Sequence, residues 1–479
     1  MTDVVKYLAT PTAPLYAQPT GRRRRIELLW GDRVHVLDSS AARWRVRARG
    51  ITGYVDPAAL GDTSLLEVYF IDVGQGDGIL IRFPDDRHVL IDGGYNRAKQ
   101  QTGKNAADFV DWKFVRDYGR DAIVLDAMMS SHCDADHYGG LWDLLEPAHQ
   151  DELDAKSVEV KAFYHAGVSW WSDAGKRNLG PVENDRLVRL LQGRTSLREA
   201  LRAGAQPALQ GEWASFLRRV LACGCKVKRL SDRTPYVPGF DPEQGAASLR
   251  VLAPVEPDKG RLYDLGSNSQ NTNGNSLVLR LDYGRARILL TGDLNRNAHR
   301  RLLEAYTGSR LDFACDVAKS CHHGSDDVSY QFLAATEPSA TIISSGDSEQ
   351  HAHPRPAIVS ASAVAGHVSV DADRLLTPLV YSTEISRSFR VGRVDALTLS
   401  GNTLDAAALA AAKARVGYKQ VNAGDLKAAS GSRRLAGSYM VTGIVYGLVN
   451  VRTDGDTLLC ATLNEKNSSW DWTTFKSRF

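Results

Sequence analysis

The chain has no uninterrupted apolar stretch of the length that crosses a bilayer, which takes about 18 residues or more. Its Ala-rich segment 404–416 is shorter and carries Lys413 and Arg415, so it predicts a packed helix. Residues 1–10 also lack a basic stretch followed by a long apolar core, which is the pattern of a secretory signal. These absences predict a cytoplasmic protein that does not use a membrane.

Cysteine is scarce as well, with six residues in a chain of 479. Cys223 and Cys225 are separated by a single glycine, which is too tight a spacing for an ordinary disulfide framework, so free thiols are expected. Cys133 and Cys321 neighbour candidate metal ligands and offer soft sulfur donors, although small buried side chains are the favoured interpretation. The sequence contains no internal repeat and no low-complexity tract.

The net charge is only +3, but the charge is unevenly distributed. Residues 1–62 carry ten basic against six acidic side chains, and residues 176–233 carry thirteen against five, so the rest of the chain is net negative. Basic segments beside a carboxylate-rich region indicate that metal ions offset the acids while a basic rim attracts a polyanion. The alternative is that both segments are solvated surfaces without a partner.

Residues 1–62 contain short strand-like runs broken by Gly and Pro, which predict a small all-β barrel. Arginines alternate along residues 43–49, so a strand there would place them on one face, with Trp44 and Val46 in the core. A basic face that includes Arg45 and Arg47 would suit nucleic acid or a protein partner, and a purely structural role is the alternative. The segment resembles bacterial SH3-like domains in the spacing of Leu15, Gly31, Trp44, Gly50 and Gly53.

The most informative segment is Ser-His-Cys-Asp-Ala-Asp-His-Tyr-Gly-Gly at residues 131–140, directly after the apolar run 122–129. It places two imidazoles and two carboxylates within six residues. His and Asp are ligands for borderline and hard divalent cations, and a loop that follows a strand can direct several of them to one point. The segment therefore predicts a metal site, with a solvated polar loop as the alternative.

Other apolar runs also end in a polar side chain, at Asp92, Asp293 and His322. Functional groups gather where strands give way to loops in layered α/β folds, so these residues are expected on a common rim. Residues 172–247 interrupt the pattern as an insertion, with helical spacing at 185–203 and 212–221. Its arginines mostly face away from the apolar side, which predicts a basic lid that binds nucleic acid through Arg186, Arg189, Arg198 and Arg202.

Six segments in order along the chain resemble the metallo-β-lactamase superfamily, and within it the ComEC-type domains: residues 70–77, 90–94, 131–140, 273–276, 290–293 and 322–325. The resemblance runs from about residue 65 to the end. It implies an α/β fold, a four-layer αββα metallo-β-lactamase sandwich with a dinuclear metal centre at one edge of the paired sheets. The expected organisation is an SH3-like barrel at 1–62 and a hydrolase domain at 65–479, with the basic helical insertion at about 172–247.

Carried over by position, the resemblance implies that His132 and Asp134 hold one ion and that Asp136 and His137 hold the second. Asp293 would bridge the two ions, and either or both of His322 and His323 would complete the second set. Residues that would orient these ligands or contact substrate are Asp77, Asp92, Asn275, Ser276 and His165. For His165, a further ligand is one interpretation and a core histidine is the favoured one.

The chain departs from many superfamily members at two places. They have His at the position of Asp134, and a further His where this chain has the turn 273–276, whereas ComEC-type sequences share both of its features. The extra carboxylate shifts the first site toward oxygen ligands, which favours Mn²⁺ relative to a His-rich zinc site. Two divalent metal ions, Zn or Mn, are therefore expected as cofactors.

Such a centre suits a metal-dependent hydrolase that attacks phosphodiesters with a metal-bridging hydroxide. Asp136, His323 and His353 are the expected catalytic residues, with His353 or the non-ligating one of His322 and His323 as general acid. The leading hypothesis is a phosphodiesterase or nuclease that acts on DNA or RNA. The alternatives are a hydrolase of a small ester, lactone, cyclic nucleotide or choline phosphate, and a binding module regulated by a partner of the barrel.

Overall fold

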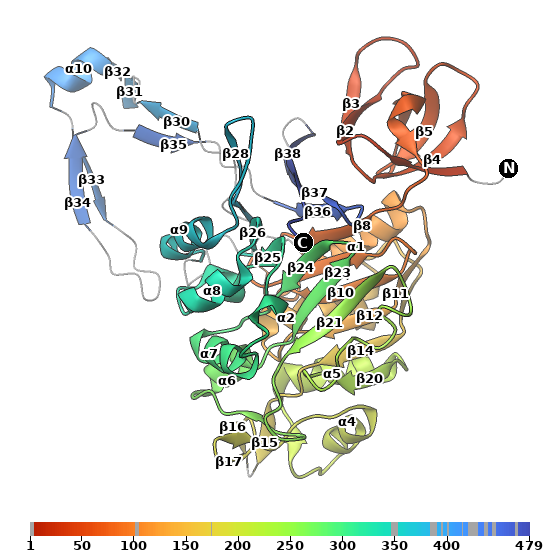
Figure 1. Ribbon diagram of the computed structural model, residues 1–479, viewed down its shortest axis with the longest axis vertical. Coiled ribbons are helices and arrows are strands. Elements are labelled where there is room, and N and C mark those ends of the chain that lie inside the picture. The colour runs from red at the N-terminus through yellow and green to blue at the C-terminus, as the bar shows by residue number, and fades with distance from the viewer. Residues whose placement is uncertain are drawn as a thin grey trace.

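The computed structural model describes residues 4–100, 105–173, 175–345, 353–383, 390–393, 396–399, 402–413, 415–419, 430–434, 439–442, 447–464 and 468–479. Two β-sheets face each other in it, and helices cover the outer side of each sheet (Figure 1).

The first sheet has nine strands in the order β20-β14-β12-β10-β9-β8-β36-β37-β38. Strand β8 pairs with β9 on one side and with β36 on the other, so strands from the two ends of the hydrolase region lie side by side. The strands are β8 (Leu66–Phe70), β9 (Gly78–Arg82), β10 (His88–Gly93), β12 (Ala127–Ser130), β14 (Ala162–His165), β20 (Lys226–Arg229), β36 (Val449–Thr453), β37 (Thr457–Asn464) and β38 (Ser469–Lys476).

The second sheet has six strands in the order β21-β23-β24-β25-β26-β29. From β24 onward its neighbouring strands are parallel, which brings the carboxyl ends of β24, β25 and β26 to one edge. The strands are β21 (Ala247–Ala253), β23 (Val278–Tyr283), β24 (Ala286–Leu290), β25 (Val317–Lys319), β26 (Ala340–Ile343) and β29 (Leu379–Ser382).

Each strand contributes side chains to the cores on both sides of its sheet, because successive side chains point to opposite faces. Val89 and Ile91 of β10 face the second sheet and share a core with Ile288 of β24, whereas Leu90 packs under the helices of the first sheet. These helices are α1 (Ala106–Trp112), α2 (Ala135–Leu145) and α5 (Gly211–Ala222). The outer core of the second sheet packs against α7 (Arg296–Ala305) and α8 (Tyr330–Thr336). The predicted helix–sheet–sheet–helix fold is confirmed.

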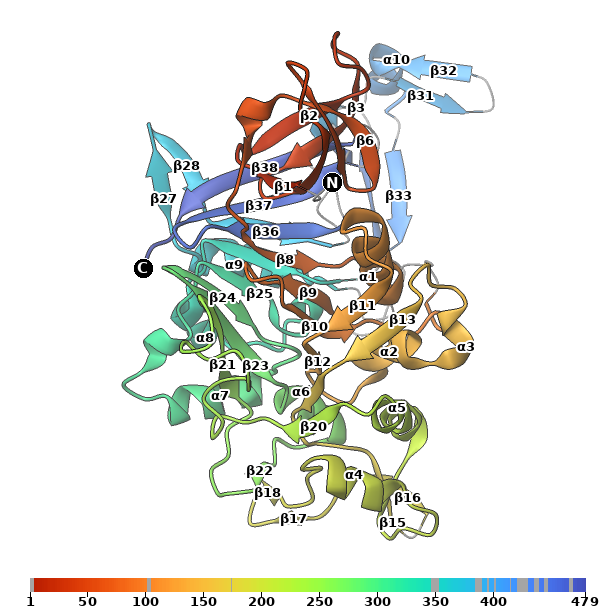
Figure 2. The ribbon, with the colours of Figure 1, turned by 90° about the vertical axis from the view of Figure 1, so that its right-hand side faces the viewer.

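The N-terminal region is all-β and forms a curled seven-stranded sheet in the order β3-β2-β6-β5-β4-β1-β7, with its own apolar core (Figure 2). The strands are β1 (Val4–Leu8), β2 (Thr12–Tyr16), β3 (Arg24–Leu29), β4 (Arg33–Asp38), β5 (Trp44–Ala48), β6 (Ile51–Val55) and β7 (Leu60–Gly61). We call this region the barrel.

Buried polar contacts fix the barrel to the first sheet. Asp32 of the barrel forms an ion pair with Arg452 of β36 at 2.8 Å. The indole N–H of Trp470, in β38, donates to the Glu27 carbonyl at 2.9 Å. Within the first sheet, Glu67 of β8 and Arg82 of β9 form a second buried ion pair at 2.8 Å. We call this group of contacts the junction.

The predicted basic face of the barrel is wrong in part. Val46 is fully buried as expected, but the opposite face of the strand does not lie open to solvent. Arg47 packs against Gly119, and the Arg49 guanidinium lies 4.9 Å from the centre of the Trp470 ring. Arg45, on the same face, stays exposed, because the contacts with the hydrolase region lie farther along the chain, at Arg47 and Arg49.

The insertion also differs from the prediction. Residues 182–187 form a hairpin, β17 (Val182–Glu183) and β18 (Arg186–Leu187), so the expected helix 185–203 is reduced to α4 (Arg194–Leu201). Asn184 and Asp185 at the turn both have positive φ, 48° and 58°, as the favoured two-residue hairpin turn requires. The helix predicted at 212–221 is confirmed by α5. Strand β20 is the edge strand of the first sheet, so the segment 172–247 is not a separate lid.

The remaining elements are smaller. The segment expected as one packed helix at 404–416 contains α10 (Ala406–Ala411), preceded by β32, and Arg415 begins β33. Among the described residues, none of the helices combines the length and apolar character that crossing a bilayer requires.

The other elements are α3 (Pro147–Gln150), α6 (Asn268–Gly274), α9 (Pro356–Ala365), β11 (Ala122–Leu125), β13 (Ser157–Val160), β15 (Trp171–Asp173), β16 (Lys176–Asn178), β19 (Ala208–Leu209), β22 (Leu262–Tyr263), β27 (Ser369–Asp371), β28 (Arg374–Thr377), β30 (Arg390–Arg393), β31 (Ala396–Leu399), β32 (Asn402–Asp405), β33 (Arg415–Lys419), β34 (Ser430–Arg434) and β35 (Tyr439–Thr442), with short 3-10 turns at Pro57–Ala59, Arg310–Asp312 and Cys321–Gly324 and a π turn at Lys113–Asp117.

Candidate metal centre

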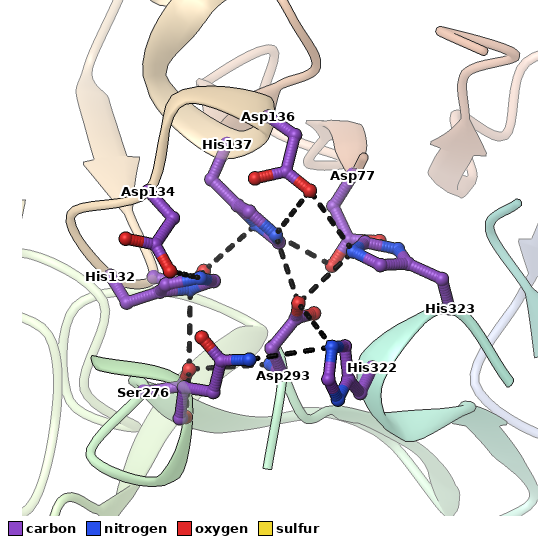
Figure 3. Close-up of polar contacts among 12 residues, drawn as sticks. Asp77, His132, Asp134, Asp136, His137, Ser276, Asp293, His322 and His323 are labelled. Atoms are coloured by element: carbon purple, nitrogen blue, oxygen red, sulfur yellow. Dashed lines mark hydrogen bonds and ion pairs between the residues drawn. The ribbon is translucent and has the colours of Figure 1, made fainter. Parts of the chain in front are cut away.

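Carboxylates and imidazoles from both sheets meet at the carboxyl ends of their strands (Figure 3). Asp92 ends β10, the loop after β12 carries His132 and Asp134, and the first turn of α2 carries Asp136 and His137. From the second sheet, Asp293 follows β24, and His322 and His323 follow β25. The arrangement arises because each apolar strand is buried along its length and its first polar residues emerge at the shared edge.

Among the described residues, four groups of side chains have the spacing of metal ligands, with the ligand atoms of each group within 4.8 Å of one another. Two groups share His137 at the centre: His132, His137 and Asp293, and Asp136, His137 and His323. The other two include Asp77, once with Asp92 and His137 and once with Asp293 and His323. Asp293 Oδ2 lies 3.2 Å from His137 Nε2 and 3.0 Å from His323 Nε2, so the candidate ligand groups overlap at this carboxylate.

Buried ring nitrogens at the centre lack hydrogen-bond partners. The Nε2 atoms of His132, His137 and His323 and Asp293 Oδ1 are all buried without a hydrogen bond of acceptable geometry among the described residues, although Asp293 Oδ2 lies close to two of the rings. A buried polar group without a partner costs about 1–3 kcal/mol, so several at one point require an explanation. A divalent cation accepts imidazole nitrogen and carboxylate oxygen together, so the residues present fit such an ion.

The opposite ring nitrogens are held by the protein. Asp92 Oδ2 lies 3.0 Å from His137 Nδ1, and its other oxygen accepts the Ser131 backbone N–H at 2.7 Å. His323 Nδ1 lies 3.1 Å from the Ser344 carbonyl, and Ser276 Oγ lies 3.3 Å from His132 Nδ1. Such contacts fix the ring orientation and leave Nε2 directed at the centre.

Electrostatics at the centre favour added positive charge. Burial and the neighbouring Asp136 raise the pKa of Asp134 to about 6. Burial and the neighbouring His137 lower the pKa of His132 to about 3. Although burial opposes it, Asp293, Asp92 and Asp136 raise the pKa of His137 well above its usual range. In the absence of other cations the imidazoles themselves supply the charge that the carboxylates demand.

Comparison with known proteins agrees with this geometry. Residues 71–200 match the model of the Metallo-beta-lactamase superfamily, a match that includes Asp92 and the whole 131–140 motif. The chain carries a metallo-β-lactamase superfamily domain. This metallo-β-lactamase domain also accounts for the two facing sheets with the candidate centre at their shared edge.

Individual relatives are more distant. ComE operon protein 3 of Bacillus subtilis (strain 168) is 23% identical over 307 residues, which cover 61% of this chain and 30% of that protein, so the chain spans about a third of its length. A diphosphatase of the PhnP family is 12% identical, with 58% of this chain and 85% of that chain covered and a TM-score of 0.27. A Cronobacter sakazakii metallo-beta-lactamase, a HARLDQ motif mutant, is 12% identical, with coverages of 54% and 77% and a TM-score of 0.24. At these TM-scores neither structure informs the site.

The two adjacent histidines of the metallo-β-lactamase domain occupy different places. His323 is 1% exposed and lies in two of the candidate ligand groups. His322 lies at the rim with its side chain 26% exposed, and its Nε2 is 3.9 Å from Asp293 Oδ2. His353 flanks this pair, with its ring centre 5.6 Å from that of His322 and 6.4 Å from that of His323.

The structure does not bring all of the predicted residues to the centre. His165 is buried at the end of β14, stacks on Phe163 and belongs to none of the ligand groups. Asn275 directs its amide to the Tyr263 and Asn271 carbonyls, where it closes the end of α6. His165 therefore lies in the core, and the Asn275 amide contacts the backbone of Tyr263 and α6, so its expected role beside the ligands or the substrate stays a prediction.

Most of the arginines predicted to bind nucleic acid have other contacts. Arg186 pairs with Asp258 at 3.3 Å and Arg189 pairs with Asp173 at 3.3 Å, both within the insertion and its neighbours. Arg198 and Arg202 are exposed at α4, at the end of the molecule opposite the barrel (Figure 1). The basic charge of the insertion is therefore not gathered into one surface beside the centre.

Several residues at the centre were missed from the sequence. Lys319, the last residue of β25, is fully buried, lies 2.5 Å from Asp77 Oδ2 and donates to the Gly292 carbonyl at 2.9 Å. Thr272 donates to Asp134 Oδ2 at 3.0 Å, and Asn273 lies 3.3 Å from His322 Nε2. A lysine inside the apolar run 316–321 is the signal that points to an acidic partner, since buried lysine is rarely unpaired.

Proposed function

We propose that this chain is a metal-dependent hydrolase of phosphodiesters, with DNA or RNA as the substrate class. The observation that carries the proposal is the set of three buried imidazole Nε2 atoms that converge on the Asp293 and Asp136 carboxylates and form no hydrogen bond of acceptable geometry among the described residues. Superfamily membership of residues 71–200 supports hydrolysis as the reaction class. The division into a barrel of residues 1–62 and a hydrolase domain of residues 65–479 belongs to the same proposal.

His132, Asp134 and Asp293 would hold one cation, and Asp136, His137, His323 and Asp293 would hold the other. Bound there, two divalent cations supply Lewis-acid chemistry that activates water and polarises a phosphoryl oxygen. Asp92 orients His137 through its Nδ1 atom, and Lys319 holds Asp77 beside His323. These contacts keep the ligand set in place before any substrate arrives.

His353 and His322 are the groups placed to protonate a leaving alkoxide. They lie together at the rim, on the side of the centre that carries Asp293, and His353 is only 7% exposed. Burial lowers the pKa of His322, so the protonated ring that a general acid requires is favoured by acidic pH.

One observation favours a smaller phosphodiester over a long polynucleotide. Arg186 and Arg189 are paired with acidic neighbours, which removes two of the expected phosphate contacts. Against this, Arg177 is exposed in β16 and stacks over Trp170 at 3.7 Å, and its charge slightly offsets the strong rise that burial causes in the pKa of Cys133, next to Asp134. A cation stacked on an indole beside the ligand loop suits a nucleotide with both a phosphate and a base.

The test is hydrolysis by the purified chain with Mn²⁺ or Zn²⁺. Substrates are single- and double-stranded DNA, RNA, bis(p-nitrophenyl) phosphate, a cyclic nucleotide, nitrocefin, a lactone and a choline phosphate ester. We expect cleavage of phosphodiesters that a chelator abolishes and that Asp293→Asn lowers by about a hundredfold or more. The control is Asp326→Asn, an exposed carboxylate three residues after His323, which should be neutral. Intact phosphodiesters with hydrolysed nitrocefin or lactone would refute the proposed substrate class.

A further inference from the structure

The turn between α5 and β20 brings two thiols together. Cys223 caps α5, with its backbone N–H donating to the Arg219 carbonyl at 3.0 Å. Gly224 has φ +80° and open space where a side chain would be, which reverses the chain after the helix. As a result, the Cys223 and Cys225 sulfurs both lie against the Val220 carbonyl oxygen, at 3.1 and 3.5 Å.

The two cysteines differ in access and in charge environment. Cys223 is exposed, whereas Cys225 is 5% exposed. A hydrogen bond from the Cys225 side chain lowers the pKa of the Cys223 thiol to about 6, and Arg194 contributes in the same direction. The Arg194 guanidinium also donates to the Cys225 carbonyl at 2.7 Å, so its positive charge is fixed beside the turn. An accessible thiolate with a thiol partner is the arrangement of a reactive pair.

The other four cysteines lack these properties. Cys133, Cys315, Cys321 and Cys460 are at most 3% exposed. Burial raises the pKa of each of them, to about 11 for Cys321. The pair at the turn is therefore chemically distinct from the rest of the cysteines in the chain.

We infer that Cys223 and Cys225 form a redox-active dithiol that low-molecular-weight disulfides of the glutathione type convert to an intramolecular disulfide. The Cys223 thiolate attacks one sulfur of the external disulfide, whose S–S bond breaks, and the departing thiolate takes a proton from water. The Cys225 thiol then loses its proton to water, and its sulfur attacks the Cys223 sulfur of the mixed disulfide and expels the second external thiol. Two protein thiols are oxidised, and one external disulfide is reduced to two thiols.

The spacing of Cys223 and Cys225 determines how readily a disulfide between them is reduced. A disulfide between residues two apart closes a small ring at an exposed turn, and exposed or strained disulfides are the ones that are easily reduced again. The pair is thus suited to reversible modification and not to permanent stabilisation. A readily reduced bond between Cys223 and Cys225 is consistent with the expectation that the chain has no structural disulfide framework.

The test is incubation of the folded chain with oxidised glutathione at pH 7.5, followed by mass spectrometry of peptides alkylated in denaturant. The wild-type chain should lose two hydrogen masses at the 223–225 peptide without gaining glutathione, and dithiothreitol should reverse the change. Cys225→Ser should retain one glutathione on Cys223, because the resolving sulfur is gone. Cys223→Ser should stay unmodified at Cys225, and the four buried cysteines should remain alkylatable in every sample.

Three outcomes would overturn the inference. One is a wild-type turn that stays fully reduced while a short peptide with one exposed cysteine is modified in the same tube. Another is a wild-type chain that keeps glutathione on Cys223 without forming the internal bond. The third is a dimer linked through Cys223 on a denaturing gel. Circular dichroism of both serine variants verifies that they fold, so failure to react is not confused with unfolding.

Discussion

The candidate centre and the junction both bury charged side chains, but they do so in opposite ways. At the junction each charge has an opposite partner within a short distance, as in Glu67 with Arg82 and Asp32 with Arg452, both at 2.8 Å. At the centre the buried carboxylates outnumber Lys319, and the Nε2 atoms of three imidazoles form no hydrogen bond of acceptable geometry among the described residues. The comparison teaches that burial of charge alone does not mark a functional site; unmatched charge and unpaired ligand atoms do.

The junction should respond most strongly to loss of one partner. Arg82→Leu leaves the buried Glu67 carboxylate without its nearest cation, and only Arg452 and Lys113 remain to offset its charge, which we expect to lower the free energy of unfolding by about 3–5 kcal/mol. Urea unfolding measures this change in the free energy of unfolding. Arg285→Gln breaks the exposed pair with Asp456 and should cost less than about 1 kcal/mol. Equal losses in the two variants would show that the junction pair is no more important than a surface pair.

Acid should weaken the junction in a defined interval. Burial alone would raise the pKa of Glu67, but Arg82, Arg452 and Lys113 outweigh it and lower the pKa to about 2 from its ordinary value of 4.5. Because the folded-state pKa is depressed, the stabilisation is complete above pH 4.5 and is lost as the pH falls toward 2. We expect the stability difference between wild type and Glu67→Gln to shrink across that interval. A difference independent of pH from 6 to 2.5 would contradict this assignment.

The centre should lose metal affinity without losing its fold. Asp92→Asn removes the negative charge beside His137 Nδ1, which we expect to weaken metal binding about 10- to 100-fold, as measured by competition with a chromophoric chelator. Asp126→Asn is the matched control, since Asp126 accepts the His88 backbone N–H at 2.8 Å away from the centre. Unchanged affinity in the Asp92 variant would place that carboxylate among purely structural groups.

The smallest effects are expected on the barrel. Arg45→Ala removes an exposed side chain and should change the free energy of unfolding by less than about 0.5 kcal/mol. Arg47→Ala removes packing against Gly119 and should cost more than the Arg45 variant. Thermal unfolding compares the two variants, whose side chains lie on the same face of β5. A larger loss for Arg45→Ala would mean that its exposed side chain makes a stabilising contact.

Much of the layering could be predicted because it follows from local pattern. Apolar runs that end in Asp92, Asp293 and His322 predict strands with polar carboxyl ends, and the structure brings these ends together at the centre. The helix predicted at 185–203 is wrong over its first residues, because Leu187, Leu190 and Leu191 also fit a helical period, whereas Asn184-Asp185 forms the turn of a hairpin. The geometry of this turn decides between helix and hairpin at these residues.

The junction could not be predicted, for a different reason. Asp32 and Arg452 lie at opposite ends of the sequence, and neither sits in a local pattern that distinguishes it from an ordinary surface charge. The same holds for Lys319 and Asp77, whose pairing depends on the two sheets facing each other. Long-range pairing of charges becomes visible only when the strand order is known.

The pairing of β8 with β36 has a consequence for synthesis of the chain. While the polypeptide emerges from the ribosome, Leu66–Phe70 have β9 on one side, but the other backbone edge waits for Val449–Thr453. An unpaired apolar edge is a template for pairing with other chains, and late closure slows folding. Until β36 has been synthesised, one backbone edge of β8 therefore lacks its native partner.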